Sequence, residues 1–318
     1  MCLSNHTYQS LIWEALFDFI THIKQVWWQV YRKIAENKIN KKNMIALYIN
    51  WDFDPEIINI YGFSLRYYGL LFVCGLLLCM HILKGIFRRE NLKESAHEAL
   101  FIYGIVGIFV GARLGHCLFY DFEYYSKNLL EIFLPIKINQ IGEIKFIGYG
   151  GLASHGGTIG LIISLYLYSK KYEIKYLKIL DLIAIVAPLG ATFIRLANLM
   201  NSEMIGNPTT MPWAFIFRKV DNIPRHPSQL YEAIAYLIIF IIVFTVYKTK
   251  NIKLGNGFLF GLAITLIFTM RILIEFVKIN QVEFENGMKL NMGQLLSIPF
   301  IIIGIYFMGS NLMRKETK

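Results

Sequence analysis

The chain has 318 residues, of which 55% are hydrophobic and 15% aromatic, and its mean hydropathy is +0.46. Soluble domains are rarely this apolar, so the composition excludes an ordinary soluble protein and favours a polytopic membrane protein. The net charge of +10 does not indicate nucleic-acid binding, because the lysines and arginines are spread over several loops instead of forming one basic patch.

Residues 1–43 differ from the rest of the chain. Glu14 and Asp18 interrupt their only apolar run, and no small-residue cleavage site follows, so they are not typical of a signal peptide. We expect either that translation starts at Met44 or that 1–43 forms an interfacial amphipathic helix. Residues 44–318 then form one seven-span domain.

Seven apolar stretches are long enough to cross a bilayer, which takes about 20 residues. They predict transmembrane helices at 66–86, 96–120, 152–169, 180–200, 229–247, 257–278 and 293–313. Nearly all other residues of the domain lie between these spans. The sequence therefore predicts an all-α, polytopic integral membrane protein with outward-facing loops.

Lysine and arginine mark alternate loops of this domain. Their clusters are Lys84, Arg88, Arg89 and Lys93; Lys170, Lys171, Lys175 and Lys178; Lys248, Lys250 and Lys253; and Arg314, Lys315 and Lys318. The loops 121–151, 201–228 and 279–292 are longer but carry fewer cations. Since cytoplasmic loops are enriched in positive charge, the first set is predicted to be cytoplasmic and the second to face outward.

Charged side chains inside the spans are costly and are therefore candidates for function. Arg113, Arg195 and Arg271 lie in the last third of the second, fourth and sixth spans, all of which run outward. His155 stands at the outward entrance of the third span, and "RHPSQLYE" at that of the fifth; Tyr68 begins the first. A transporter is expected to spread such groups through the midplane. One polar layer near the outer face instead indicates a site for a lipid headgroup.

Helical spacing groups some of these residues. Arg195, Asn198 and Ser202 lie within about 60° of one another on a helix, and Arg271 shares a face with Glu275. A guanidinium matches phosphate or carboxylate oxygens, so converging arginines predict an anion site for a phospholipid. The alternative is structural: Arg271 pairs with Glu275, and Arg195 caps carbonyl groups.

His155 is followed by Gly156 and Gly157, which we interpret as opening room for a bulky ligand beside the ring. An imidazole can act as a base near neutral pH or donate to phosphate oxygens. The role of His226 is left open between a functional and a structural one, because Pro227 and Ser228 after it are also typical of a helix start.

Repeated glycines indicate close helix packing, since small residues four apart let helix backbones approach. They are Gly107, Gly111 and Gly115 in the second span, and Gly156 and Gly160 in the third.

The chain contains no phosphate-binding loop, dinucleotide fingerprint, zinc-protease motif or serine-hydrolase motif. Its cysteines, Cys2, Cys74, Cys79 and Cys117, lack the spacing of a metal site. We expect no metal and no cofactor.

The ordered motifs carry a resemblance. "GARLGHCLFYD", "GGLASHGGTIG", "RLANLMNSEMIG", "RHPSQLYE", "MRILIEFVK" and "MGQLLSIP" are similar to those of the prolipoprotein diacylglyceryl transferase family, from about Met44 to the C-terminus. The resemblance implies a seven-span enzyme of the bacterial cytoplasmic (inner) membrane, with its active site toward the periplasmic face and its C-terminus in the cytoplasm.

The resemblance also implies a reaction. The diacylglyceryl group of phosphatidylglycerol passes to the lipobox cysteine of a prolipoprotein signal peptide, a thioether forms, and glycerol 1-phosphate leaves. The attacking sulfur then belongs to the substrate, which agrees with a chain that offers no nucleophile of its own. The partners implied are phosphatidylglycerol, the prolipoprotein and the lipid bilayer, with no nucleic acid.

Matched to the family's motifs, Arg195 is the phosphatidylglycerol-binding arginine, Arg271 the essential arginine of the sixth span, and His155 the proposed base. The remaining positions expected to bind substrate are Tyr68, Arg113, Gly156, Gly157, Asn198, Asn201, Glu203, Gly206, His226 and Glu275.

Two other functions compete with the transferase. A lipid transporter or flippase would need a polar path to the cytoplasmic side, for which Asp181 at the inner end of the fourth span is the one candidate. A non-catalytic scaffold that binds anionic lipid would leave lipoprotein modification intact when Arg195 or Arg271 is replaced.

Overall fold

The computed structural model describes residues 48–316, apart from gaps at 61–62, 135, 139–143, 147–150, 152, 250–254, 256, 280–284, 286–287 and 289. The described part from Ile49 onward belongs to one compact unit. The prediction made for residues 1–43 lies outside the described residues.

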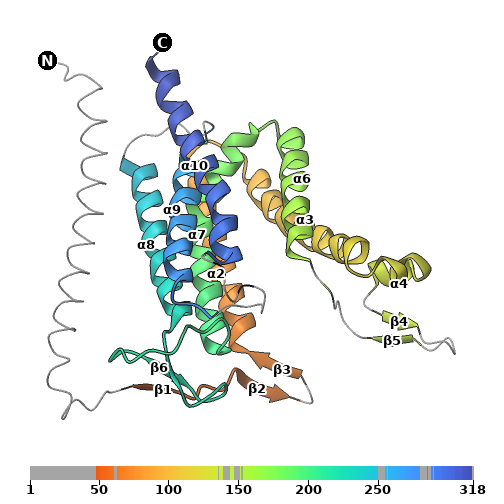
Figure 1. Cartoon of the computed structure of the whole chain (residues 1–318). Helices are drawn as coiled ribbons and strands as arrows, with labels where there is room; N and C mark the ends of the chain where they lie inside the picture. Colours follow the sequence, from red (N-terminus) through yellow and green to blue (C-terminus); the bar gives the residue numbers. More distant parts are fainter. Residues whose placement is uncertain are drawn as a thin grey trace, which may run out of the picture. The chain divides into compact units, whose positions relative to one another are not determined.

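Long helices dominate the described part of the chain (Figure 1). They are α2 (Tyr67–Arg89), α3 (Glu94–Phe119), α6 (Ser154–Tyr172), α7 (Tyr176–Met200), α8 (Ser228–Thr249), α9 (Phe258–Glu275) and α10 (Met292–Glu316). Each coincides with a predicted span to within a few residues, so the helical membrane fold predicted from the sequence is confirmed. Two short helices, α4 (Phe122–Lys127) and α5 (Leu130–Phe133), follow α3.

Six of the described helices are long and apolar enough to cross a membrane. The exception is α6, which forms where a seventh span was predicted but is less apolar. Its first turn contains Ser154 and His155, and its last turn contains Lys170 and Lys171.

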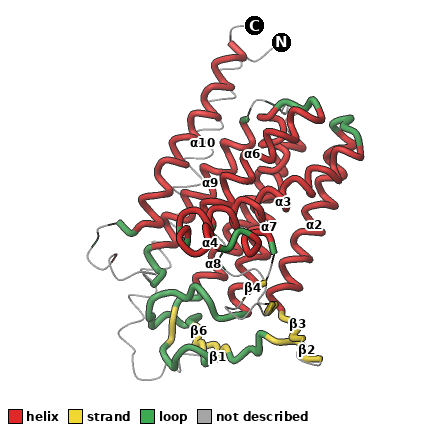
Figure 2. The backbone as a smooth tube through the Cα atoms, turned by 90° about the vertical axis from the view of Figure 1, so that its right-hand side faces the viewer, coloured by secondary structure: helices red, strands yellow, loops and turns green. Residues whose placement is uncertain are grey.

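Short strands in the loops were absent from the all-α prediction. β1 (Ile49–Trp51) pairs in parallel with β6 (Phe215–Phe217), which pairs antiparallel with β7 (Pro224–Arg225). Two hairpins are formed by β2 (Glu56–Ile60) with β3 (Phe63–Arg66), and by β4 (Ile136–Ile138) with β5 (Ile144–Phe146). Figure 2 shows β1, β2, β3 and β6 at one end of the helices.

The sheet β1–β6–β7 is fastened to the C-terminal end of α7. The indole Nε1 of Trp51 donates to the Leu199 carbonyl oxygen at 3.1 Å, and Leu199 packs with Phe215 and Phe217. We call this end of the helices the sheet end; it is the predicted outward end.

The largest apolar core lies toward the opposite end, where the basic loops are. It joins residues of α2, α3, α6, α7, α8 and α9, among them Phe87, Tyr168, Ile179 and Val243. The Tyr168 hydroxyl donates to the Ala96 carbonyl oxygen at 2.8 Å, which ties α6 to α3. Elsewhere the helices expose large apolar side chains, as a surface in contact with lipid requires.

Buried Asp181 fixes α7 to the start of α9. Its carboxylate accepts the backbone N–H groups of Gly255, Gly257 and Phe260 at 2.9–3.0 Å. These are unpaired donors at a helix N-terminus, where a carboxylate is stabilising. Gly255 and Gly257 have φ of +103° and +80°, which favours glycine at both positions.

The repeated glycines join α3 to α6, as their spacing predicted. A Cβ atom added to Gly111 would clash with the backbone of Gly156 and Gly160, and one added to Gly160 would clash with the Gly107 carbonyl oxygen. Because the backbones touch, this seam tolerates no side chain larger than hydrogen.

We predict that Gly111→Leu lowers the free energy of unfolding by about 1–3 kcal/mol or more, because it overpacks the seam. Gly104→Leu is the matched control, since nothing lies within 4 Å of its added Cβ on the same helix. Denaturant titration of both purified variants measures the difference. Equal losses for the two variants would contradict the assigned seam.

Candidate functional site

Arg195 lies near the sheet end of α7 and faces a carboxylate on α8. Its Nε atom is 2.9 Å from Oε2 of Glu232, whose side chain is fully buried. The two groups form an ion pair without the alignment of a good hydrogen bond. The alternative that Arg195 caps carbonyl groups is therefore wrong: its partner is a carboxylate on a neighbouring helix.

Lys278, just after α9, faces the same carboxylate. Its Nζ atom lies 2.9 Å from Oε1 of Glu232 and 3.5 Å from Oε2 of Glu275. We call Arg195, Glu232, Lys278 and Glu275 the buried charge network. It contains two cations and two anions and joins α7, α8 and the end of α9. Paired charges are the form in which buried ions are tolerated.

Arg271 stands apart from this network. Its predicted alternative, an ion pair with Glu275, is wrong, because Glu275 faces Lys278 and packs against Gly293. Among the described residues, half-buried Arg271 has no ion-pair partner within 4.0 Å. Both Arg271 and Arg195 lie in the surroundings of the Tyr236 hydroxyl. Of these two arginines, only Arg195 has a counter-ion within the described residues.

The residues that follow Arg195 form a connected polar group. Nη1 of Arg195 donates to Oδ1 of Asn198 at 3.3 Å. The side-chain amides of Asn198 and Asn201 each donate to the carboxylate of Glu203 at 3.1 Å. Ser202 has φ of +55°, an uncommon conformation outside glycine, and turns the chain sharply after α7. The sharp turn brings Glu203 back toward Asn198.

Gly206 lets the loop after α7 pass between α8 and α9. Its N–H donates to the His226 carbonyl oxygen at 2.9 Å. An added Cβ would lie 2.5 Å from that oxygen and 2.7 Å from the Val277 carbonyl oxygen. A larger residue would push the loop away from the network.

The start of α8 holds the same loop from the other side. Ser228 Oγ donates to the Met204 carbonyl oxygen at 2.6 Å, and the Gln229 amide donates to the Glu203 carbonyl oxygen. Both side chains are fully buried. The motif "HPSQLYE" thus supplies two side chains that bind the backbone of this loop, in addition to Glu232.

His226 faces Tyr231, whose hydroxyl lies 3.1 Å from Nδ1 and accepts a hydrogen bond from Trp213 Nε1 at 2.8 Å. Burial lowers the pKa of His226 below its usual value, which disfavours the charged imidazolium. These contacts favour a role in positioning the loop.

The remaining predicted site residues lie on other helices. Arg113 on α3 is buried; its Nε donates to the Ile132 carbonyl oxygen at 3.1 Å and its Nη2 donates to the Glu131 carbonyl oxygen, so it holds α5. Tyr68 lies half-buried in the first turn of α2. No described contact joins either residue to the buried charge network.

His155 lies in the first turn of α6, exposed, with no hydrogen bond to the described residues. Gly156 and Gly157 both face α3. Gly156 also lines an apolar cavity between α3 and α6, so the space predicted beside the ring is found at Gly156 and not at Gly157. The structure gathers Arg195, Asn198, Asn201, Glu203, Gly206, His226, Glu275 and Arg271 near the sheet end of α7–α9. It does not bring His155, Gly156 or Gly157 into contact with them.

Glu232 and Lys278 are missing from the predicted site. Glu232 ends the quoted "RHPSQLYE", and Lys278 stands three residues after Glu275. The rule that a buried charge needs a partner would have indicated both, once α7, α8 and α9 were assumed to be neighbours. Within the described residues, no group of three His, Cys, Asp or Glu side chains is placed to hold a metal ion.

Comparisons with known proteins agree with the motifs. Residues 55–309 match the family model described as prolipoprotein diacylglyceryl transferase. The chain is 54% identical over 266 residues to the phosphatidylglycerol–prolipoprotein diacylglyceryl transferase of Bacteroides fragilis, covering 84% of this chain and 96% of the relative. The enzymes so named from Tolumonas auensis and Porphyromonas gingivalis are each 41% identical, over 259 and 278 residues. These matches cover 81% and 82% of this chain, and 95% and 94% of the relatives. The resemblance seen in the motifs is confirmed: the chain belongs to the prolipoprotein diacylglyceryl transferase family.

Proposed function

We propose that this chain transfers the diacylglyceryl group of phosphatidylglycerol to the lipobox cysteine of a prolipoprotein signal peptide. The cysteine sulfur attacks the glyceryl carbon that carries the phosphate, the C–O bond breaks, and a thioether forms. Glycerol 1-phosphate leaves, and a base takes the thiol proton. Family membership and the membrane helices support this reaction at the bacterial inner membrane, where the chain is a multi-pass protein.

The observation that carries the site assignment is Arg271, a half-buried cation that has no counter-ion within 4.0 Å among the described residues. The buried charge network beside it contains equal numbers of cations and anions. A charge inside a membrane protein is costly unless it is neutralised. The phosphate diester of phosphatidylglycerol carries the single negative charge that neutralises Arg271, and a guanidinium matches its oxygens.

Arg195 supports the same phosphate as the reaction proceeds. The phosphate gains negative charge when the C–O bond breaks, and positioned donors stabilise such developing charge. Glu232 holds the Nε side of the guanidinium and Asn198 accepts from Nη1, so the orientation of Arg195 is fixed before substrate binds. Asn198, Asn201 and Glu203 form the polar wall next to it.

His155 is our candidate for the group that activates the thiol or orients the headgroup. The ring is exposed and makes no hydrogen bond to the described residues, which leaves both nitrogens free to meet substrate. It stands on α6, whereas the arginines stand on α7 and α9.

We propose that the sheet end faces the periplasm and that the C-terminus is cytoplasmic. The basic loops lie at the opposite end of the helices, in agreement with the positive-inside rule. A secreted prolipoprotein then meets the arginines on the side to which it is exported.

The transporter alternative depended on Asp181 as a polar step toward the cytoplasm. Its carboxylate is occupied by three N–H groups at the start of α9, a structural role that weakens this alternative.

We predict a diacylglyceryl mass gain when the purified protein is incubated with phosphatidylglycerol and a lipobox peptide that contains one cysteine. Mass spectrometry follows the peptide, and an enzymatic assay follows released glycerol phosphate. A Cys→Ser peptide should gain nothing. No mass gain from a folded, lipid-binding preparation would overturn the proposed function.

We predict that Arg195→Gln and Arg271→Gln each slow transfer by about 100-fold or more, as losing a donor to a developing oxyanion does. Arg218→Gln, at an exposed arginine that bonds Asn50 and Asn222, is the control and should retain activity. Intact lipoprotein modification in either of the first two variants would favour the scaffold alternative.

Stability should separate the two arginines. Arg195→Gln breaks a buried pair and should cost about 3 kcal/mol of unfolding free energy. Arg271→Gln breaks no ion pair among the described residues and should cost less. Adding Glu232→Gln to Arg195→Gln should restore most of the stability without restoring transfer. Equal destabilisation by the two single variants, measured by denaturant titration, would contradict the assigned pairing.

For the orientation, we predict that a membrane-impermeant maleimide labels Asn222→Cys in intact spheroplasts but labels Lys171→Cys only after permeabilisation. Both residues are exposed, at opposite ends of the helices, and the native cysteines are replaced by alanine. The reverse labelling pattern would invert the proposed topology.

A further inference from the structure

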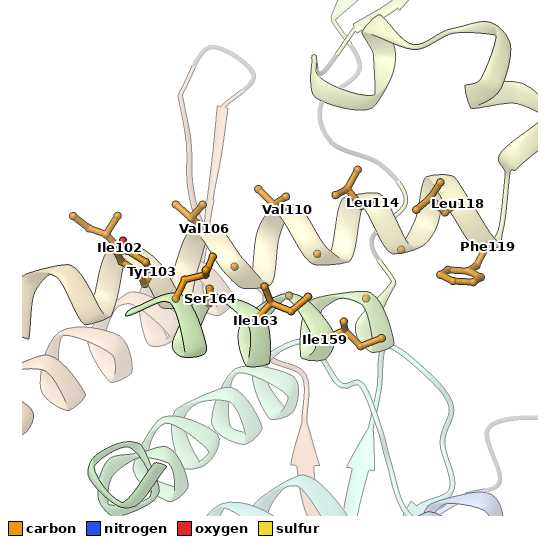
Figure 3. A pocket seen from close by; sticks show the side chains of 16 residues that line it. Ile102, Tyr103, Val106, Val110, Leu114, Leu118, Phe119, Ile159, Ile163 and Ser164 are labelled. Carbon is orange, nitrogen blue, oxygen red and sulfur yellow. The ribbon is translucent and has the colours of Figure 1, made fainter. Parts of the chain in front are cut away.

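An apolar groove runs along the seam between α3 and α6 (Figure 3). Its volume is about 510 Å³. The glycines of the seam form its floor, and larger side chains rise on both sides, among them Val106, Val110 and Leu114 on α3 and Ile159 and Ile163 on α6. The groove therefore exists because the helix backbones touch while their flanking side chains remain large.

The lining offers almost no polar group to a ligand. Tyr103 and Ser164 lie toward the inner part, and the Ser164 hydroxyl already donates to the Leu161 carbonyl oxygen at 3.0 Å. The walls are open to the surroundings: Val106 is 53% and Ile159 56% exposed. Because α3 is a candidate membrane span, the medium around these walls is hydrocarbon.

One end of the groove lies beside His155. Gly156, the next residue, lines this end together with Gly115 and Phe119. From Gly156 the α6 side runs to Leu167, about 16 Å at 1.5 Å per residue. That length matches one leaflet, about half of a hydrocarbon core of roughly 30 Å.

The shape of the groove distinguishes between possible occupants. Its volume spread over the roughly 16–26 Å covered by its lining helices gives a cross-section of about 20–30 Å². A helix with side chains, about 10–12 Å across, needs about 80 Å² or more. A groove of this cross-section and length fits one extended hydrocarbon chain better than a helical signal peptide.

We propose that this groove binds one acyl chain of the substrate phosphatidylglycerol, with the headgroup at the end next to His155. This inference rests on the proposed function, and it adds a chain-binding site on α3 and α6 to the arginine site on α7–α9. A chain in the groove guides the lipid headgroup to the end where the polar layer lies.

A matched pair of variants tests the groove. Ile163 lines it and its neighbour Ile162 does not, although each is 53% exposed on α6. We expect Ile163→Trp to raise the KM for dipalmitoyl phosphatidylglycerol about tenfold, since it displaces several buried methylenes. Ile162→Trp should leave the KM unchanged.

Chain length supplies an internal control. Ile163 lies about 10 Å along α6 from Gly156, beyond the reach of a dioctanoyl chain, so Ile163→Trp should leave the KM for dioctanoyl phosphatidylglycerol unchanged. Equal effects of both variants, or an equal effect on both lipids, would overturn the proposal.

A cross-linking readout is independent of activity. Phosphatidylglycerol with a diazirine near its chain terminus should label wall residues such as Val106 and Ile163, and Ile163→Trp should reduce that labelling several-fold. If all lipid-facing helices were labelled to the same extent, the label would report ordinary annular lipid, and the proposed acyl-chain site would be overturned. Labelling of the same wall by a photoreactive lipobox peptide would assign it to the signal peptide. If the wild-type chain cross-links as expected but transfers no diacylglyceryl group, the proposed function is wrong while the acyl-chain site in the groove is supported.

Discussion

The site depends on one buried carboxylate, Glu232, which has no exposed surface and faces two cations. An ionised carboxylate at this depth needs partners, and they come from different helices: Arg195 from α7 and Lys278 from the end of α9. Lys278 in turn faces Glu275, which closes the network at neutral charge. Because these pairs satisfy one another, Arg271 remains as the cation that an anionic lipid can neutralise.

The loop after α7 serves the same arrangement. It turns sharply at Ser202, brings Glu203 to the two asparagines, and passes between α8 and α9 where Gly206 allows it. The sheet β1–β6–β7 covers the end of α7 from outside. On the other side of the molecule, the glycine seam aligns α3 with α6 and leaves an apolar groove that ends at His155. Phosphate chemistry and chain binding are thus assigned to different helix groups.

Much of the helical fold was predictable from the sequence, because hydrophobicity, charge bias and glycine spacing are local signals. They located the long helices and the seam of Gly111 and Gly160. Motif resemblance then identified the family. The partner of Arg195 was missed because Glu232 lies on another helix, and spacing along one helix says nothing of such pairs. The expected Arg271–Glu275 pair failed for a related reason: Lys278 faces Glu275 instead. The short strands lie in loops without a clear alternating pattern.

The most direct test of a phosphate site at Arg271 is the affinity of two lipids for the wild-type chain and for Arg271→Gln, measured by native mass spectrometry. Phosphatidylglycerol presents the phosphate and diacylglycerol lacks it. We expect Arg271→Gln to weaken phosphatidylglycerol binding about tenfold, as loss of a hydrogen bond to a charged group does, and to leave diacylglycerol binding unchanged. Unchanged phosphatidylglycerol affinity, or an equal loss for both lipids, would contradict a phosphate site at Arg271.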